Sequence, residues 1–347
     1  MRIQIADGYD ISRIIKGGWH LAGDHGVIDP EQAVHDMAAF VEAGITTFDC
    51  ADIYTGVEAL IGRFRGLYPR LAKEVQVHTK FIPDLRMLAE VDFDYVERSI
   101  DRSLMRLGLE RLDLVQFHWW DYEVPGYVEA AVALSRLRDK GKIANIGATN
   151  FDVPRLTQIL EAGVPVVSMQ AQYSLLDERP RNGMIDLCVR KNIAVICYGT
   201  VAGGFLSERW VGRQEPGGDL TNRSLIKYKL IIDDFGGWDL FQQLLAALGR
   251  VAAKHGCDMA TVASRAVLNW DHVAAIIVGA TDASHLGANR GIADLPLDAA
   301  DAAAIEAVLR QRQGPQGDVY SLERDRTGRH GRIMKYDLHQ KENYAAH

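Results

Sequence analysis

The chain carries eight short runs of apolar residues, separated by longer stretches in which apolar residues recur at helical spacing. Apolar residues at consecutive positions are typical of strands that are buried on both faces, as in parallel sheets. The eight predicted strands are SRIIKGGW (12–19), ITTFDC (45–50), VQVHTKF (75–81), LDLVQFHW (112–119), IANIGATN (143–150), VPVVSMQAQ (164–172), NIAVICYG (192–199) and HVAAIIVGA (272–280). Alternating strands and helices predict a parallel sheet, and eight repeats predict closure into an α/β fold, the (β/α)8 TIM barrel.

The stretches between these runs predict helices, and several of them end in glycine. Glycine is common just beyond a helix because it adopts the left-handed backbone conformation without strain. The predicted helices cover 30–44, 94–108, 126–141, 153–163, 184–192, 260–270 and 298–311. No linker or low-complexity segment interrupts this pattern, so we predict one barrel domain over residues 1–312.

Three segments fall outside the repeat. The N-terminal residues IQIADGYDIS (3–12) predict a short hairpin that closes the barrel floor. Residues 200–238 are rich in glycine and show little apolar periodicity, which predicts a long loop after the seventh strand; loops of that length usually serve a function. Residues 313–347 form a polar C-terminal extension, for which packing over the barrel mouth and disorder are both open.

Composition and charge narrow the classes of partner. The chain has 347 residues, 48% hydrophobic and 24% charged, and a formal net charge of -7 with both signs interspersed. This charge argues against nucleic acid or a membrane surface as an electrostatically bound partner and favours a small molecule. No apolar run approaches the roughly 18 residues of a membrane span, and the N-terminus lacks a signal-peptide pattern, which predicts a cytoplasmic protein. The cysteines show no CxxC pair and no metal-ligand spacing, so we predict buried reduced thiols and no metal site, for Cys50, Cys188, Cys197 and Cys257.

Four polar residues stand where successive predicted strands end. Asp49 closes the second strand and Tyr54 follows it, Lys80 lies in the third, and His118 in the fourth, with spacings of 31 and 38 residues between the strand ends. In a parallel barrel such ends meet at one face. An ammonium about 4 Å from a phenol lowers the phenol's pKa by about three units, and a carboxylate keeps the ammonium charged. With a histidine to donate to the substrate oxygen or orient the phenol, the set predicts proton delivery to a carbonyl. Each residue alone also fits a structural role, but four at successive strand ends favour catalysis.

A second set lies at strands five to eight. Thr149, Asn150 and Gln170 offer amide and hydroxyl groups, and Tyr198 offers a flat ring, which together suit a carboxamide on an aromatic heterocycle. At the end of strand eight, Gly279 and Ala280 form a turn before a helix that we expect to open at Asp282, a common phosphate site in barrels. Since neither GxGxxG nor GxxxxGK[ST] occurs, we expect any dinucleotide at the barrel mouth.

The motifs FDCADIY, HTK, QFH, KGKIANIGATN and VGATDASHLGAN together resemble the aldo-keto reductases, over about residues 5–312. The resemblance implies an NAD(P)(H)-dependent oxidoreductase that reduces an aldehyde or ketone to an alcohol, or the reverse. It implies a catalytic tetrad of Asp49, Tyr54, Lys80 and His118, with Tyr54 as the proton donor. It also implies that Asn150 and Gln170 bind the nicotinamide carboxamide, Tyr198 stacks on its ring, and Asn289 contacts adenine.

Two departures from the family pattern concern the cofactor site. Thr149 replaces the family's usual serine and keeps the hydroxyl. NADPH-preferring members carry lysine or arginine after the strand-eight turn, where this chain has Thr281 and His285, with Arg290 the nearest cation. We therefore predict that NADP(H) binds, but with a weaker preference over NAD(H) than in relatives that carry arginine there, so NAD(H) is an alternative cofactor.

The predicted substrate pocket is aromatic and apolar, which suits a planar or hydrophobic carbonyl or alcohol. Strand alternation predicts that only one of Trp119 and Trp120 faces inward. Trp238, at the end of the long loop, is a candidate lid residue. The candidate pocket residues are Trp19, Ile53, Phe81, Trp119 and Trp120.

Two other functions fit part of the pattern. Lysines at barrel strand ends also form Schiff bases, so a barrel aldolase with Lys80 as nucleophile is one alternative, although a carboxylate that keeps this lysine protonated disfavours it. A cofactor-sensing binding protein that resembles channel β-subunits is another, because an intact tetrad does not separate a sensor from an enzyme.

Overall fold

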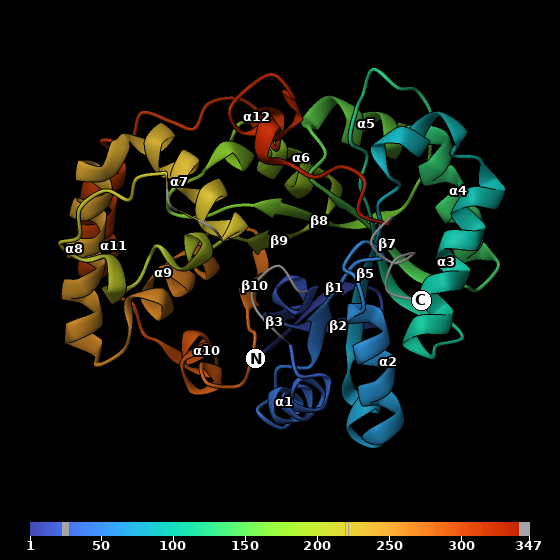
Figure 1. The fold of residues 1–347 in the computed structure, drawn as a ribbon, viewed down its shortest axis with the longest axis horizontal. Helices are drawn as coiled ribbons and strands as arrows, with labels where there is room; N and C mark the ends of the chain where they lie inside the picture. The colour runs from blue at the N-terminus through green and yellow to red at the C-terminus, as the bar shows by residue number, and fades with distance from the viewer. Residues whose placement is uncertain (23–27, 219, 221, 340–347) are drawn as a thin grey trace.

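The computed structural model describes residues 1–22, 28–218, 220 and 222–339. Eight parallel strands close into a barrel with the hydrogen-bonded order β10-β3-β4-β5-β6-β7-β8-β9. The barrel strands are β3 (Ile14–Gly17), β4 (Thr47–Asp49), β5 (Gln76–Phe81), β6 (Leu112–Phe117), β7 (Ile143–Thr149), β8 (Val166–Gln172), β9 (Ala194–Tyr198) and β10 (Val273–Gly279). The predicted (β/α)8 barrel is therefore confirmed (Figure 1).

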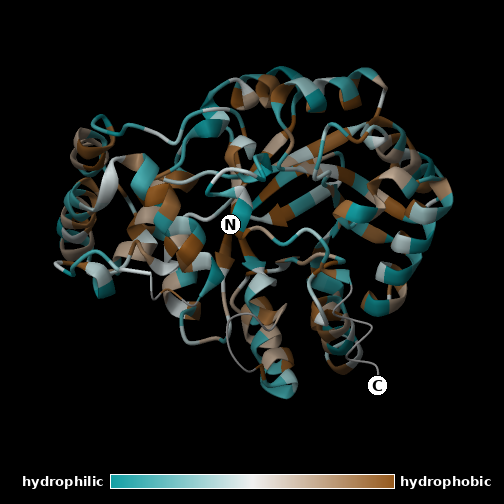
Figure 2. Cartoon of the chain, turned by 45° about the horizontal axis from the view of Figure 1, so that its top comes forward, coloured by the Kyte–Doolittle hydropathy of each residue, from teal (hydrophilic) through white to brown (hydrophobic). Residues whose placement is uncertain are grey.

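Helices surround the barrel and cover it with apolar stripes (Figure 2). In α3, for example, Asp92 caps the N-terminus by accepting from the Tyr95 amide, and Gly108 ends the helix at a φ of 62°. The surrounding helices are α1 (Pro30–Glu42), α2 (Val57–Leu67), α3 (Phe93–Leu107), α4 (Tyr127–Asp139), α5 (Val153–Glu161), α6 (Met184–Lys191), α8 (Gly237–His255), α9 (Met259–Leu268), α10 (Leu286–Asp294) and α11 (Ala299–Leu309).

The predicted N-terminal hairpin is present as β1 (Arg2–Ala6) and β2 (Tyr9–Ser12), paired antiparallel. Ile5 and Ile11 are buried against Ile15, Ile196 and Ala274 of the barrel. This apolar contact closes the barrel floor, so ligands enter at the opposite end.

The predicted long loop over residues 200–238 is wrong in its second half, because α7 (Arg223–Phe235) is a helix. Asn222 caps it by accepting from the Ser224 and Leu225 amides. Its buried face repeats at helical spacing, with Tyr228, Ile231, Ile232 and Phe235. The apolar spacing and the Asn222 cap were the signals for this helix in the sequence. The glycine-rich residues just before them favoured the prediction of a loop instead.

The C-terminal extension packs over the barrel mouth as far as residue 339; residues 340–347 of the predicted extension lie outside the described residues. It contains the short helix α12 (Ser321–Arg324). Asp318 accepts from the Val153 amide at the start of α5, and the Leu85 amide donates to the Tyr336 carbonyl on the far side of the mouth. Figure 1 shows this red segment crossing from the side of α11 toward the side of α3.

Among the residues that the structure describes, no helix is both long and apolar enough to cross a membrane. The four cysteines form no disulfide; three are buried as predicted, while Cys257 is partly exposed.

Candidate active site

A cavity of about 260 Å³ opens at the carboxyl ends of the barrel strands. Its wall brings together most of the predicted site residues, which come from all eight barrel strands or the segments that follow them. Those that line it are Asp49, Tyr54, Lys80, His118, Thr149, Asn150, Gln170, Tyr198 and Gly279, together with Trp19, Ile53 and Trp120.

A buried ion pair lies at the base of the cavity. Lys80 Nζ donates to Asp49 Oδ2 at 2.6 Å and to the Cys50 carbonyl at 2.8 Å. Asp49 Oδ1 accepts from Gln116 Nε2 at 3.0 Å and from Gln170 Nε2 at 2.7 Å. Burial alone would lower the pKa of Lys80, but attraction to Asp49 outweighs it and raises this pKa, so the lysine stays charged. The sequence analysis missed Gln116, although its place two residues before His118 put it on the inward face.

Tyr54 stands beside this pair. Lys80 Nζ lies 5.0 Å from the centre of the Tyr54 ring, and the Trp19 ring meets the same phenol edge-on at 5.1 Å. Desolvation raises the pKa of Tyr54, while Lys80 acts in the opposite direction. We expected the lysine to dominate; in the structure, loss of water outweighs it, because Asp49 also screens the lysine charge. The phenol is therefore protonated at neutral pH.

His118, the fourth member of the predicted set, is a neutral imidazole in the structure. Burial and the nearby Arg324 lower its pKa well below the usual range. Its Nδ1 lies 3.0 Å from the Thr149 carbonyl, which only accepts, so the single proton of the neutral ring sits on Nδ1. Nε2 is buried and has no hydrogen-bond partner among the described residues, so it is left as an acceptor on a ring that lines the cavity.

The amides at strands β7 and β8 have complementary free groups. Asn150 Oδ1 accepts from the Tyr198 hydroxyl at 2.9 Å, which leaves Nδ2 to donate. Gln170 Nε2 is engaged by Asp49 and by Gln116 Oε1, which leaves Oε1 to accept. One donor and one acceptor on the same wall match the oxygen and the nitrogen of a carboxamide. Asn150 adopts a φ of 61°, a conformation that asparagine tolerates better than most residues.

The end of β10 is more open. The ring of His20 packs on Gly279, where a side chain would clash, and Ala280 is buried. Thr281 and His285 are both exposed. The following helix, α10, begins at Leu286 and not at Asp282 as predicted, because the Asp282 carboxylate accepts from the Ser284 amide in a turn. Further along α10, Asn289 Nδ2 is buried without a partner in the described chain, as an adenine contact would require.

Three predicted aromatic positions lie outside the cavity wall. Phe81 stacks on Phe117 between barrel and helices, and Trp119 is fully buried with Nε1 donating to the Asp121 and Val124 carbonyls. Strand alternation predicted that only one of Trp119 and Trp120 faces inward. Trp120 is the one that lines the cavity. Trp238, the candidate lid, is buried in α8 against Trp210 and donates to the Arg213 carbonyl, so it covers nothing.

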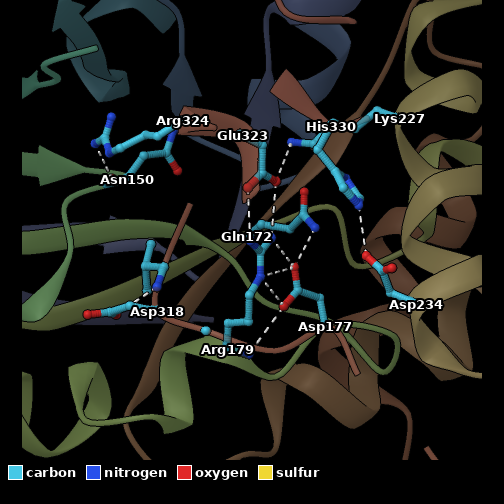
Figure 3. A network of polar contacts seen from close by, with 12 residues as sticks. Asn150, Gln172, Asp177, Arg179, Lys227, Asp234, Asp318, Glu323, Arg324 and His330 are labelled. Atoms are coloured by element: carbon cyan, nitrogen blue, oxygen red, sulfur yellow. Dashed lines mark hydrogen bonds and ion pairs between the residues drawn. The ribbon is translucent and has the colours of Figure 1, made fainter. Parts of the chain in front are cut away.

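The C-terminal extension adds residues that the sequence analysis did not assign to the site. Tyr320, Ile333, Met334 and Leu338 line the cavity. Arg324 donates to the carbonyls of Trp119 (2.7 Å), Trp120 (3.1 Å) and Asn150 (2.7 Å), as Figure 3 shows in part. The extension thus ties together the strand ends that carry His118 and Asn150. No group of metal-ligating side chains occurs among the residues that the structure describes.

Comparison with known proteins places these features in context. A model described as "Aldo/keto reductase family" matches residues 13–310. Flagellar radial spoke protein 5 of Chlamydomonas reinhardtii is 31% identical over 254 residues, which cover 62% of this chain and 48% of that protein. The NADH-specific methylglyoxal reductase of Escherichia coli (strain K12) is 25% identical over 314 residues, covering 84% and 93%.

Among solved structures, the glycerol dehydrogenase of Gluconobacter oxydans has a TM-score of 0.77 over 91% of this chain and 97% of its own, at 22% identity. At that identity the similarity concerns the fold alone. The family match ends before the C-terminal extension, so residues 313–339 and their contacts with the cavity lie beyond it.

Proposed function

This chain belongs to the aldo/keto reductase family, and on that premise we propose that it transfers hydride between a nicotinamide cofactor and the carbonyl carbon of a small aldehyde or ketone. The observation that carries the proposal is the buried Lys80–Asp49 pair beside a protonated Tyr54 in the cavity wall. A charged lysine next to a phenol stabilises the phenolate that remains once the proton has left.

The residues divide the chemistry between them. A bound reduced nicotinamide supplies the hydride. Tyr54 donates its proton to the carbonyl oxygen as negative charge develops there, and Lys80 stabilises the resulting phenolate. His118 Nε2, a lone-pair acceptor, would accept a hydrogen bond from the hydroxyl of the alcohol, while the Tyr54 proton is directed at the carbonyl oxygen. Asp49 keeps Lys80 charged.

The amide set supports the cofactor part of the proposal. Asn150 Nδ2 and Gln170 Oε1 would hold the carboxamide, and Tyr198 would stack on the nicotinamide ring. Asn289 would contact adenine. Thr149, Gly279 and Ala280 would complete the wall.

We propose that NADP(H) and NAD(H) both bind, with a weak preference for NADP(H). Thr281 and His285 offer one hydroxyl and one imidazole to a 2′-phosphate, where a guanidinium would offer a rigid pair of donors. The Asp282 carboxylate lies in the same turn and opposes binding of an anion. The Escherichia coli relative is, by its name, NADH-specific, which is compatible with a family member that lacks strong phosphate selection.

The alternatives receive less support. An aldolase needs Lys80 as a free amine, but Asp49 raises the pKa of Lys80, so the lysine carries a proton at neutral pH. A cofactor sensor would bind NAD(P)(H) without turnover, and the site geometry alone is the same in both cases.

Fluorescence titration with NADPH and with NADH, followed by a panel of aldehydes and ketones, tests the proposal. We expect saturable binding of both cofactors and oxidation of NAD(P)H with part of the panel. Binding without any turnover would favour the sensor, and trapping of a substrate on Lys80 by borohydride would favour the aldolase.

A further inference from the structure

Lys227 on α7 reaches into the cavity wall but is not engaged by the proposed chemistry. Its Nζ lies 5.2 Å from the ring centre of Tyr198, 5.6 Å from that of Tyr228 and 5.6 Å from that of Tyr320. Only 17% of its side chain is exposed. The ammonium is thus held among three aromatic faces, with little water around it.

The charge of Lys227 has a weak partner. Glu323 of α12 is the one carboxylate within ion-pair distance among the described residues, at 3.9 Å, too far for a hydrogen bond. Glu323 is already bound by both terminal nitrogens of Arg179, at 2.9 and 3.0 Å, and Arg179 also bridges to Asp177 (Figure 3). Lys227 donates no hydrogen bond within the described part of the chain.

The rest of the cavity wall does not supply an anion. Asp49 is the one carboxylate among the described lining residues, and it is paired with Lys80 at 2.6 Å. Positive charge in a largely desolvated wall attracts a negatively charged ligand group, because water screens the attraction poorly there.

The position of Lys227 relates it to the reacting end of the cavity. The Tyr320 ring stands between Lys227 and His118, with its centre 5.5 Å from that of the His118 ring. The Tyr54 phenol is close enough to contribute to the raised pKa of both Tyr228 and Tyr320, after the larger effect of burial. Lys227 and Tyr54 line one cavity, so a ligand that fills this cavity lies against both residues.

We propose that Lys227 binds the carboxylate of the carbonyl substrate, so that this enzyme prefers aldehydes or ketones that carry a negative charge remote from the carbonyl. The inference rests on the proposed reductase function. A diphosphate of the cofactor is the other source of negative charge, because the Tyr198 ring, 5.2 Å from Lys227 Nζ, belongs to the proposed cofactor site. We place Lys227 on the substrate side because Tyr320 and Glu323, its partners from the extension, lie on the side where the Tyr320 ring meets His118.

The test compares two charged aldehydes, 3- and 4-carboxybenzaldehyde, with their neutral counterparts, 3- and 4-formylbenzamide. For the wild type we expect a higher kcat/KM with at least one charged aldehyde than with its amide. Lys227→Met should lower kcat/KM for the charged aldehyde by about 10- to 100-fold, mainly through KM, because a hydrogen bond between charged groups is lost. The amides should be reduced as before.

Lys229→Met is the matched control. Lys229 lies two residues further along α7, is also mostly buried, and pairs with Glu215 and Asp233 away from the cavity. Lys229→Met should leave the preference for the charged aldehyde over its amide unchanged. Lys227→Arg should retain part of that preference.

Several outcomes would overturn the inference. A wild type that reduces acids no better than amides, or a preference that survives Lys227→Met, would contradict it. If Lys227→Met raised the Kd for NADPH and NADH, and lowered kcat/KM equally for all four aldehydes, Lys227 would be assigned to the cofactor diphosphate. Absence of NAD(P)H oxidation with all carbonyls tested would instead contradict the proposed function itself.

Discussion

As the proposed proton donor, Tyr54 must keep its proton until the substrate oxygen becomes basic, and its surroundings favour the protonated phenol. Desolvation raises the pKa of the phenol, and the Lys80 ammonium, 5.0 Å from the ring centre, acts against the rise. The acid is therefore protonated at rest but has a cation beside it when it loses its proton. Asp49 stabilises the same cation, which is why removal of either charge would disturb the phenol.

For Tyr54→Phe we expect carbonyl reduction to fall by about 10²- to 10⁴-fold, because the general acid is removed while the ring remains. Cofactor affinity should stay nearly constant, since the phenol faces substrate and not the carboxamide site. Single-turnover kinetics with fluorescence titration of the cofactor measure both quantities. A variant with a third of wild-type turnover, under conditions where chemistry is rate-limiting, would contradict the assignment.

His285→Arg should strengthen NADPH binding while NADH binding changes little. Arginine offers a fixed fork of donors to a 2′-phosphate, and position 285 is exposed at the N-terminal end of α10, where backbone amides also favour anions. The ratio of the two dissociation constants is the measurement, with wild type as reference. An unchanged ratio would place the 2′-phosphate elsewhere, for example near Arg290.

At the scale of elements, the four-residue helix α12 connects several parts of the cavity wall. Glu323 faces Arg179 and Lys227 on one side, and Arg324 binds the ends of β6 and β7 on the other (Figure 3). Arg324 also donates to the Tyr122 hydroxyl at 2.7 Å and lies 4.0 Å from the centre of that ring. A short helix from outside the barrel repeat thus braces the loops on which His118 and Asn150 lie.

Arg324→Gln should destabilise the fold by about 1–3 kcal/mol, because partly buried carbonyl acceptors lose a charged donor. It should also weaken cofactor binding, since Asn150 loses the contact that fixes its backbone, and it should change the pH profile because a cation next to His118 is gone. Thermal unfolding and NADPH titration measure the first two effects.

Arg326→Gln is the control for this prediction. Arg326 is exposed and pairs only with Asp121 at 3.1 Å among the described residues, and exposed pairs contribute little. If Arg324→Gln behaved like Arg326→Gln in unfolding and in titration, the bracing role of α12 would be wrong.

At the scale of the whole molecule, the extension is attached on both sides of the mouth. On the side of β5, His339 Nδ1 lies 2.8 Å from Asp84 Oδ1, and Asp84 also accepts from the Leu338 amide at 3.0 Å. Burial would lower the pKa of His339, but Asp52 and Asp84 outweigh it and raise this pKa to about 10. The same contacts lower the pKa of Asp84.

These shifts predict how stability depends on pH. A histidine with a raised pKa stabilises the fold fully below its unfolded value of about 6.5, and the contribution is lost as the pH rises through about 10. The stability difference between wild type and His339→Gln should thus be about 1.5–3 kcal/mol near pH 6 and small above pH 10. Thermal unfolding between pH 6 and 10.5 measures it, with His35→Gln, an exposed histidine on α1, as control. A difference that is the same at every pH would refute the charged contact.

The sequence by itself determined the barrel and the meeting of its strand ends. Consecutive apolar residues repeat with the period of the fold, and parallel strands bring their carboxyl ends to one face whatever the side chains are. For that reason the order of residues in the chain already predicted that Asp49, Lys80, His118 and Gln170 meet at one end of the barrel. The family's motifs occur in the same segments, so local order in the chain was enough.

Only the tertiary structure decided what surrounds those residues. Lys227, Glu323 and Arg324 come from segments without a strand-helix repeat, and contacts between positions 96 and 205 residues apart leave no local pattern. Phe81, by contrast, packs behind the wall because alternation along the strand turns it away from Lys80, so its direction could have been predicted from the sequence. The net pKa of Tyr54 also depended on burial, which outweighed the neighbouring lysine, and burial is a property of the packed molecule and not of the order of its residues.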